Sequence, residues 1–317
     1  EICFNPDIPV EDVINRCFSL GLFEYVVPHY IDQELYTPND PNIGNQYYLT
    51  RIKAIQAWDI CKGDTNKVTA ITDTGFEFNH PDLVNAVKYN YNDTIDGIDN
   101  DNDGYTDNFK GWDMGSMDNN PQYDQIGHGI HVSGIAGASA DNGFGMAGVG
   151  FRGKLLPVKV DNAYGNLIAT YEGIVYAADH GADVINCSWG STFSGTLYGQ
   201  DIINYATFNC NALVVAACGN ANSTSLYYPA SYNYVMSVAA SDVNDSKWVN
   251  SSYNYMVDIT APGKDIYSTW TGASLIVSSG TSMASPVVSG AASLVSSYFP
   301  QYNMLQVAER MRVTADI

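Results

Sequence analysis

The sequence has 317 residues, 45% of them hydrophobic and 15% charged, which is enough for one large domain with a sizeable core. Its 34 acidic residues outnumber 14 Lys and Arg, and the net charge of −20 argues against a nucleic-acid partner, because phosphate binding needs clustered cations. No apolar run reaches the roughly 18 residues of a membrane-spanning helix. We expect a soluble monomer whose acidic surplus suits metal cations.

The N-terminal part differs in pattern from the rest of the chain. Residues 2–4 and 23–30 are strand-like, residues 9–22 have helical spacing, and the turn-rich residues 36–41 indicate a linker. Glu1 is not a natural start, so we expect that a preceding segment has been removed. The division predicted here is a small unit over 1–38 and a main domain over 39–317, with a C-terminus that ends early.

From about Lys67 onward, short apolar runs alternate with helical patterns. Continuous apolar runs favour strands buried on both faces, and their alternation with helices predicts an α/β fold with a mostly parallel sheet covered on both sides. Active sites of such sheets gather at the carboxyl ends of the strands. The predicted strands are 68–72, 155–160, 183–187, 213–217 and 234–239, and the predicted helices are 128–140, 170–180, 200–209 and 283–298.

Three segments together hold the parts of a catalytic relay. Asp73 ends an apolar strand before Thr-Gly, His128 opens a helix of small residues, and Ser282 lies between a glycine turn and an apolar helix. A serine is a weak nucleophile unless a histidine takes its proton, and a buried carboxylate orients that histidine. Each residue alone is more simply a cap or turn former, but the conjunction predicts nucleophilic catalysis.

These segments resemble the three signature motifs of the subtilisin family, D-[ST]-G, H-G-x-H-V-x-G and G-T-S-M-A-S-P, the last matched residue for residue. The resemblance extends from roughly Thr37 to the end of the chain. It implies the family fold and hydrolysis of peptide bonds through an acyl-enzyme. It also implies that Asn220 donates to the oxyanion together with the backbone N–H of Ser282, with Thr281 assisting beside them.

The resemblance also implies the walls that bind substrate. One wall is an edge strand that pairs with the substrate backbone. The other wall lies at the end of the predicted strand 213–217, just before Asn220. Trp189 is expected to line a distal apolar pocket, and Tyr227 to make the first pocket shallow, which predicts small or medium side chains before the scissile bond. The expected substrate-binding residues are Ser188, Trp189, Gly190, Ala217, Gly219 and Tyr227.

An acidic run between residues 92 and 125 predicts a calcium loop. It holds one lysine, Lys110, and nine aspartates: Asp93, Asp96, Asp99, Asp101, Asp103, Asp107, Asp113, Asp118 and Asp124. The spacing D-x-D-x-D-G from Asp99 is typical of a Ca²⁺ loop, but the twelfth position is Lys110 instead of Glu, so this is not an EF-hand. The predicted ligands are Asp99, Asp101, Asp103, Asp107 and the carbonyl of Tyr105.

A second calcium site is implied by the resemblance alone, with Asp82 matching a family ligand and Asn142 in the loop that supplies the others. The family also implies that residues 23–41 end a propeptide whose tail lies in the cleft. On that basis we expect a zymogen or self-inhibited form, cleaved near Leu35–Tyr36, and a secreted, cell-surface or periplasmic location.

The six cysteines allow fifteen pairings, and Cys187 and Cys218, in apolar runs, are expected to be buried free thiols. Two other functions were weighed against a serine endopeptidase. A calcium-stabilised binding or adhesion module on an inactive protease fold predicts losses among the catalytic residues, and none is seen. A serine esterase of another fold would carry G-x-S-x-G, whereas Ser282 lies in Gly-Thr-Ser-Met-Ala.

Overall fold

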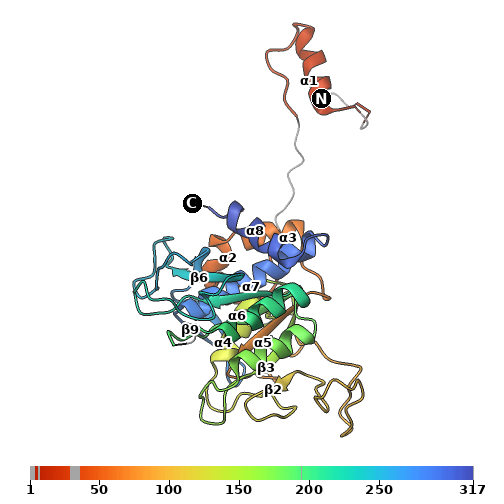
Figure 1. Ribbon diagram of the computed structural model, residues 1–317. Helices are drawn as coiled ribbons and strands as arrows, with labels where there is room; N and C mark the ends of the chain where they lie inside the picture. The colour runs from red at the N-terminus through yellow and green to blue at the C-terminus, as the bar shows by residue number, and fades with distance from the viewer. Residues whose placement is uncertain (1–3, 6–7, 29–35, 194, 317) are drawn as a thin grey trace. The chain divides into compact units, whose positions relative to one another are not determined.

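The computed structural model describes residues 4–5, 8–28, 36–193 and 195–316. The chain divides into two compact units, Glu1–Leu35 and Tyr36–Ile317 (Figure 1). In the first unit, helix α1 spans Val10–Ser19, inside the predicted helix. Residues 23–28 form no strand, contrary to prediction, since one extended segment in so small a unit finds no strand to pair with. Residues 2–3 and 29–30 of the predicted strands lie outside the described part.

The second unit is built on a seven-stranded sheet with the order β2-β3-β1-β4-β5-β6-β7. All neighbouring strands are parallel. The five predicted strands are confirmed as β1, β3, β4, β5 and β6, whereas β2 and β7 were not predicted. The strands are β1 Val68–Asp73, β2 Trp112–Asp113, β3 Lys154–Lys159, β4 Val184–Cys187, β5 Leu213–Ala217, β6 Val235–Ser241 and β7 Ile259–Pro262.

Helices lie on both faces of this sheet, as predicted. They are α2 Tyr47–Arg51, α3 Ala54–Ile60, α4 His128–Gly137, α5 Thr170–Asp179, α6 Leu197–Asn204, α7 Thr281–Tyr298 and α8 Met304–Thr314, with a 3₁₀-helix at Ile43–Asn45 and a π-helix at Tyr205–Asn209. A separate antiparallel hairpin pairs β8 Ile266–Trp270 with β9 Ser274–Ser278. None of the helices in the described part is long and apolar enough to span a bilayer.

Alternation along the strands divides the core in two. Ile71 and Val215 pack on one face with residues of α4 and α7, whereas Ala70 and Val214 pack on the other face with α5 and α6. Side chains of successive strand residues point to opposite faces, so apolar runs are what a sheet covered on both sides requires. The result is a three-layer α/β arrangement with α7 crossing behind the central strands (Figure 1).

The ends of three strands and the starts of two helices meet at one edge of the sheet. Strands β1, β4 and β5 end there, because parallel neighbours share their direction, and helices α4 and α7 begin there. Helix α4 ends at Gly137, shorter than the predicted 128–140, because the amide of Ser139 donates to the carbonyl of Asp82 instead of continuing the helix. That early end frees residues 138–148 to form a loop against Asp82.

The cysteines of the described part carry free thiols. Cys187 ends β4 and Cys218 follows β5, and both are buried and unpaired, as predicted. Burial raises the pKa of the Cys187 thiol to about 12 and that of Cys218 to about 11, so both stay protonated and unreactive.

Candidate active site

Asp73 and His128 form the first pair of the site. Nδ1 of His128 lies 2.8 Å from Oδ1 of Asp73, and because a carboxylate can only accept, Nδ1 carries the proton and Nε2 is free to act as a base. Burial lowers the pKa of His128, but the charge of Asp73 and its hydrogen bond raise it more, so the net pKa lies above the usual value. The ring is 32% exposed at the cleft while Asp73 is buried.

Thr74 fixes the distance between these two residues. Its amide donates to Oδ1 of Asp73 at 2.8 Å, and its hydroxyl donates to the carbonyl of Ile126 at 2.8 Å. The same hydroxyl accepts from the amide of Gly129, the second residue of α4. The end of β1 and the start of α4 are thereby joined, which orients the imidazole. The sequence motif contained Thr74, but its role was not predicted.

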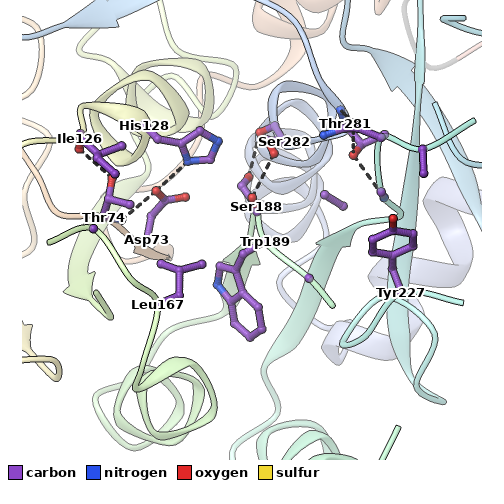
Figure 2. A pocket seen from close by; sticks show the side chains of 16 residues that line it. Asp73, Thr74, Ile126, His128, Leu167, Ser188, Trp189, Tyr227, Thr281 and Ser282 are labelled. Carbon is purple, nitrogen blue, oxygen red and sulfur yellow. Dashed lines mark hydrogen bonds and ion pairs between the residues drawn. The ribbon is translucent and has the colours of Figure 1, made fainter. Parts of the chain in front are cut away.

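Ser282 faces His128 across the cleft from the first turn of α7 (Figure 2). Its hydroxyl donates to the backbone carbonyl of Ser188 at 3.0 Å, and the hydroxyl of Ser188 donates in return to the carbonyl of Ser282 at 2.8 Å. The expected Ser282–His128 hydrogen bond is therefore not made in this arrangement. Catalytic hydrogen bonds of this kind commonly tighten only when substrate binds.

Asn220 lies beside this serine with its amide already oriented. Its Oδ1 accepts from both the amide and the hydroxyl of Thr281, each at 2.9 Å. With the oxygen held in this way, Nδ2 is the end left to donate into the cleft. The hydroxyl of Thr281 also accepts from the amide of Gly219 at 3.3 Å, so Thr281 joins the start of α7 to the loop after β5.

A cavity of about 530 Å³ contains all of the predicted catalytic and substrate-binding residues. The ring of Tyr227 packs so closely on Gly219, at φ +105°, that an added Cβ would lie 2.6 Å from it. Nε1 of Trp189 donates to the carbonyl of Thr72, which fixes the indole. Lining residues that were not predicted are Thr74, which lies in the Asp73 motif, and Ile126, Gly165, Leu167 and Ala221, which lie outside the motifs and reach the cavity only through the fold.

Two aspartates of the acidic run, Asp113 and Asp124, form ion pairs with a buried lysine. Nζ of Lys159, at the end of β3, lies 2.9 Å from Asp113, 3.1 Å from Asp124 and 3.1 Å from Asp161. Burial lowers the pKa of this ammonium, but its hydrogen bonds to the three carboxylates raise it more, so it remains charged. Because Asp124 lies four residues before His128, Lys159 anchors the segment that leads into the site.

Asp82 and Asn142, predicted as one calcium site, do lie together. Nδ2 of Asn142 donates to Oδ1 of Asp82 at 2.9 Å, and the amide of Met146 donates to Oδ2. Burial, together with the charge of Asp40, raises the pKa of Asp82 to about 6 against its hydrogen bonds. Asp40 is itself buried, accepts from the amide of Asp141, and was missed because Asn-Asp-Pro is also a common turn sequence.

The aspartates predicted to bind calcium in the acidic loop fall into two groups in the structure. Carboxylate oxygens of Asp93, Asp99 and Asp101 lie within 4.8 Å of one another. Asp103 instead lies 2.8 Å from Nε2 of His180, at the end of α5, and Asp107 accepts the amides of residues 96 and 97. Asp93, which was not among the predicted ligands, thus joins the group, while Asp103 and Asp107 fasten the loop.

The ring of Tyr105, whose carbonyl is a predicted ligand, packs edge-on against Trp112 and Tyr176. Burial raises the pKa of its phenol, with smaller contributions from the charges of Asp179 and Asp103. The tyrosine therefore anchors the acidic loop to α5 through its side chain.

Comparisons with known proteins agree with this geometry. Residues 64–316 match the Subtilase family. The chain is 43% identical to thermitase of Thermoactinomyces vulgaris, over 83% of this chain and 86% of that protein, and 38% identical to a thermophilic serine proteinase of Bacillus sp. (strain AK1), over 97% and 71%. A solved structure of a protease from Pseudoalteromonas arctica PAMC 21717 superposes with a TM-score of 0.77 at 27% identity, covering 89% of this chain and 93% of that one. The chain belongs to the subtilase family of serine proteases and is a subtilisin-like serine endopeptidase.

Proposed function

We propose that Asp73, His128 and Ser282 are the catalytic residues of this endopeptidase. The observation that carries the assignment is the 2.8 Å contact between Nδ1 of His128 and Asp73, opposite a serine at the first turn of α7. Nε2 of His128 takes the Ser282 proton as Oγ attacks the peptide carbonyl, and later gives that proton to the leaving amine. Asp73 holds the tautomer and stabilises the imidazolium.

The oxyanion is stabilised by two donors in this proposal. Nδ2 of Asn220 points into the cleft because its oxygen is bound to Thr281, and the backbone N–H of Ser282 belongs to the first turn of a helix, where amides have no intrahelical partner. Labelling by a fluorophosphonate tests the assignment. Wild-type protein should label and Ser282→Ala should not, whereas labelling that persists in the variant would place the nucleophile elsewhere.

Substrate is proposed to bind by strand addition along Ser188, Trp189 and Gly190, with Ala217 and Gly219 on the opposite wall. The carbonyl of Ser188 is the natural acceptor for a substrate amide, and when the substrate takes it, the Ser282 hydroxyl is released toward His128. Asp73 is the one acidic residue among the described residues that line the cavity, and it is engaged by His128, so basic side chains gain no partner there before the scissile bond.

Tyr227, packed on Gly219, narrows the first pocket, which supports a preference for small or medium side chains. Trp189 and Leu167 offer an apolar surface to residues farther from the bond. Profiling on a peptide library tests both points. Efficient cleavage after Arg or Lys together with poor cleavage after Ala or Leu would contradict the proposed pocket.

Calcium is the proposed cofactor. At one site, Asp82 and the newly identified Asp40 present buried carboxylates beside the exposed Asn142, and burial makes these carboxylates costly without a cation. At the other, Asp93, Asp99 and Asp101 converge, and oxygen ligands of this kind suit Ca²⁺. The calcium would neutralise these carboxylates and fix their loops, while taking no part in peptide hydrolysis.

We further propose that the protein works outside the cytoplasm as a polypeptide hydrolase. Loop sites that bind Ca²⁺ with modest affinity suit a compartment with about millimolar calcium. The N-terminal segment is proposed to be a propeptide remnant that inhibits the enzyme until self-cleavage near residues 35–36. N-terminal sequencing after incubation tests this, and Glu1 persisting in a fully active preparation would contradict it.

A further inference from the structure

Lys247 places its ammonium among four oxygens at the base of the oxyanion loop, defined here as residues 218–223. Nζ lies 2.9 Å from Oδ1 of Asn222, 3.1 Å from the carbonyl of Ser251, 3.2 Å from that of Trp248 and 3.4 Å from that of Val249. An ammonium has three N–H donors, which are shared here among three backbone carbonyls and one side-chain oxygen. The lysine side chain is exposed, and its ammonium links the side chain of Asn222 to backbone carbonyls of residues 248–251.

The segment that supplies these carbonyls runs beside the oxyanion loop. The amide of Ser252 donates to the carbonyl of Gly219 at 2.9 Å, and the amide of Asn222 donates to the carbonyl of Asn250 at 2.9 Å. The amide of Ala221 donates to the hydroxyl of Ser252 at 3.3 Å. These bonds bracket Asn220 on both sides, so its backbone position depends on the segment 250–252.

The loop needs such support because packing does not hold it. Asn220, Ala221 and Asn222 are exposed, whereas Ser251 and Ser252 are fully buried. Asn222 also adopts a left-handed backbone, φ +47°, which asparagine accepts more readily than most L-residues. The Lys247 ammonium is a partner that ties the side chain of Asn222 to the buried segment.

We propose that Lys247 is a positioning residue for the oxyanion donor: it anchors Asn222 to segment 248–251 and thereby fixes Asn220. This inference rests on the proposed oxyanion role of Asn220. Removing an oxyanion donor altogether costs about 10²–10³ in kcat, so loosening one should cost less, roughly tenfold. The loss should fall on kcat and spare KM, because the donor acts on the developing charge and not on the bound peptide.

The test compares Lys247→Ala with Lys264→Met, which removes an exposed lysine elsewhere. We expect Lys247→Ala to lower kcat about tenfold at unchanged KM. The variant should also bind a peptide boronate, which mimics the transition state, more weakly by a similar factor. Its affinity for a product-like peptide should be unchanged. Ammonium or potassium ions added to this variant should restore part of the lost kcat, and Lys264→Met should behave as wild type.

A second variant keeps the test decisive if Lys247→Ala folds poorly. Asn222→Gly removes the Oδ1 acceptor at a backbone angle that suits glycine, so it should fold normally and show the same loss of kcat. Unchanged kcat in folded variants, with only a lower Tm, would overturn the positioning role. If Asn220→Ala keeps full kcat, the oxyanion assignment itself fails, and the two failures are distinguished.

Discussion

Ser188 and Ser282 exchange hydrogen bonds, each hydroxyl donating to the backbone carbonyl of the other residue, at 2.8 Å and 3.0 Å. The Ser188 hydroxyl also accepts from Nδ2 of Asn186, a buried residue that binds Ser285 of α7 through its oxygen. Strand β4 and the residues after it, which are proposed to bind substrate, are thus fastened to the helix that carries the proposed nucleophile. Substrate binding and release of the Ser282 hydroxyl are therefore expected to be coupled.

Replacing Ser188 with alanine tests this coupling. The variant keeps the carbonyl that a substrate would use but loses the hydrogen bond to Ser282, worth about 1 kcal/mol, so kcat/KM should fall about fivefold. Steady-state kinetics on one peptide substrate measure this, with Ser191→Ala, at a nearby half-buried serine that does not line the cavity, as the control. An unchanged kcat/KM would mean that the exchanged bonds do not position the nucleophile.

The pH dependence of the reaction should report on His128. Because Asp73 raises its pKa, the acid limb of kcat/KM should lie above the pH of about 6.5 expected for a free imidazole. Asp73→Asn removes the charge, so activity should fall by about 10⁴-fold, as in trypsin-like triads. The acid limb of the variant's remaining kcat/KM should move to lower pH. A limb that stays in place would show that another group controls the profile.

Tyr227→Ala should widen the first pocket. The kcat/KM for a substrate with Phe before the scissile bond, divided by that for a substrate with Ala there, should rise about tenfold or more. Each additional methylene-sized group that the pocket buries is worth about tenfold or more in kcat/KM. Competition between two peptides in one reaction gives this ratio directly. The same change at Tyr255, an exposed tyrosine that does not line the cavity, serves as the control.

Removal of calcium should destabilise the protein in a pH-dependent way. The folded pKa of Asp82 is raised to about 6, so metal-free stability falls as the pH rises from about 4 to 6, and bound calcium offsets that fall. A proton competes with the metal at pH 5, so the stabilisation by calcium should be about 1.4 kcal/mol smaller there than at pH 7.5.

Thermal unfolding with and without a chelator at the two pH values measures this effect. In Asp82→Asn, the difference between pH 5 and pH 7.5 should disappear. An equal chelator effect at both pH values in the wild type would exclude Asp82 as a ligand.

His131 should contribute to acid sensitivity. Burial, and then the charge of His128, lower its pKa to about 4, so below the unfolded value of about 6.5 the unfolded state binds a proton first. Stability is therefore expected to fall by about 3 kcal/mol between pH 6.5 and pH 4 through this residue alone. His131→Asn cannot take up that proton, and urea titrations should show a flatter pH dependence in the variant.

The sequence predicts some parts of this site far better than others. Asp73, His128 and Ser282 are recognisable because each lies in a dense motif at an element end. Lys159 was not, because a lysine inside a strand pattern gives no sign of three carboxylates from distant segments. Asp40 was missed for a similar reason, since its nearness to Asp82 exists only after folding.

The partners of the aspartates in the acidic run could not be predicted from the sequence either. The composition of the run predicts a cation loop, but composition does not assign each carboxylate. Folding brings Asp113 and Asp124 to a lysine, Asp103 to a histidine, and Asp93 with Asp99 into a group that could hold calcium. The direction of the Ser282 hydroxyl could not be predicted from the sequence either, because it depends on the carbonyl of Ser188, 94 residues away.

The order of the seven strands bears on how long the enzyme lasts once made. Apart from the consecutive strands β4, β5, β6 and β7, neighbouring strands of the sheet come from segments that are distant in the sequence. Strand β1 pairs only with residues 154–159 and 184–186, so neither of its edges can form hydrogen bonds until these segments have folded against it. Such non-local pairing makes spontaneous folding slow and makes partly folded chains prone to association. Heat inactivation should therefore be practically irreversible, and working lifetime should follow the unfolding rate instead of the equilibrium free energy.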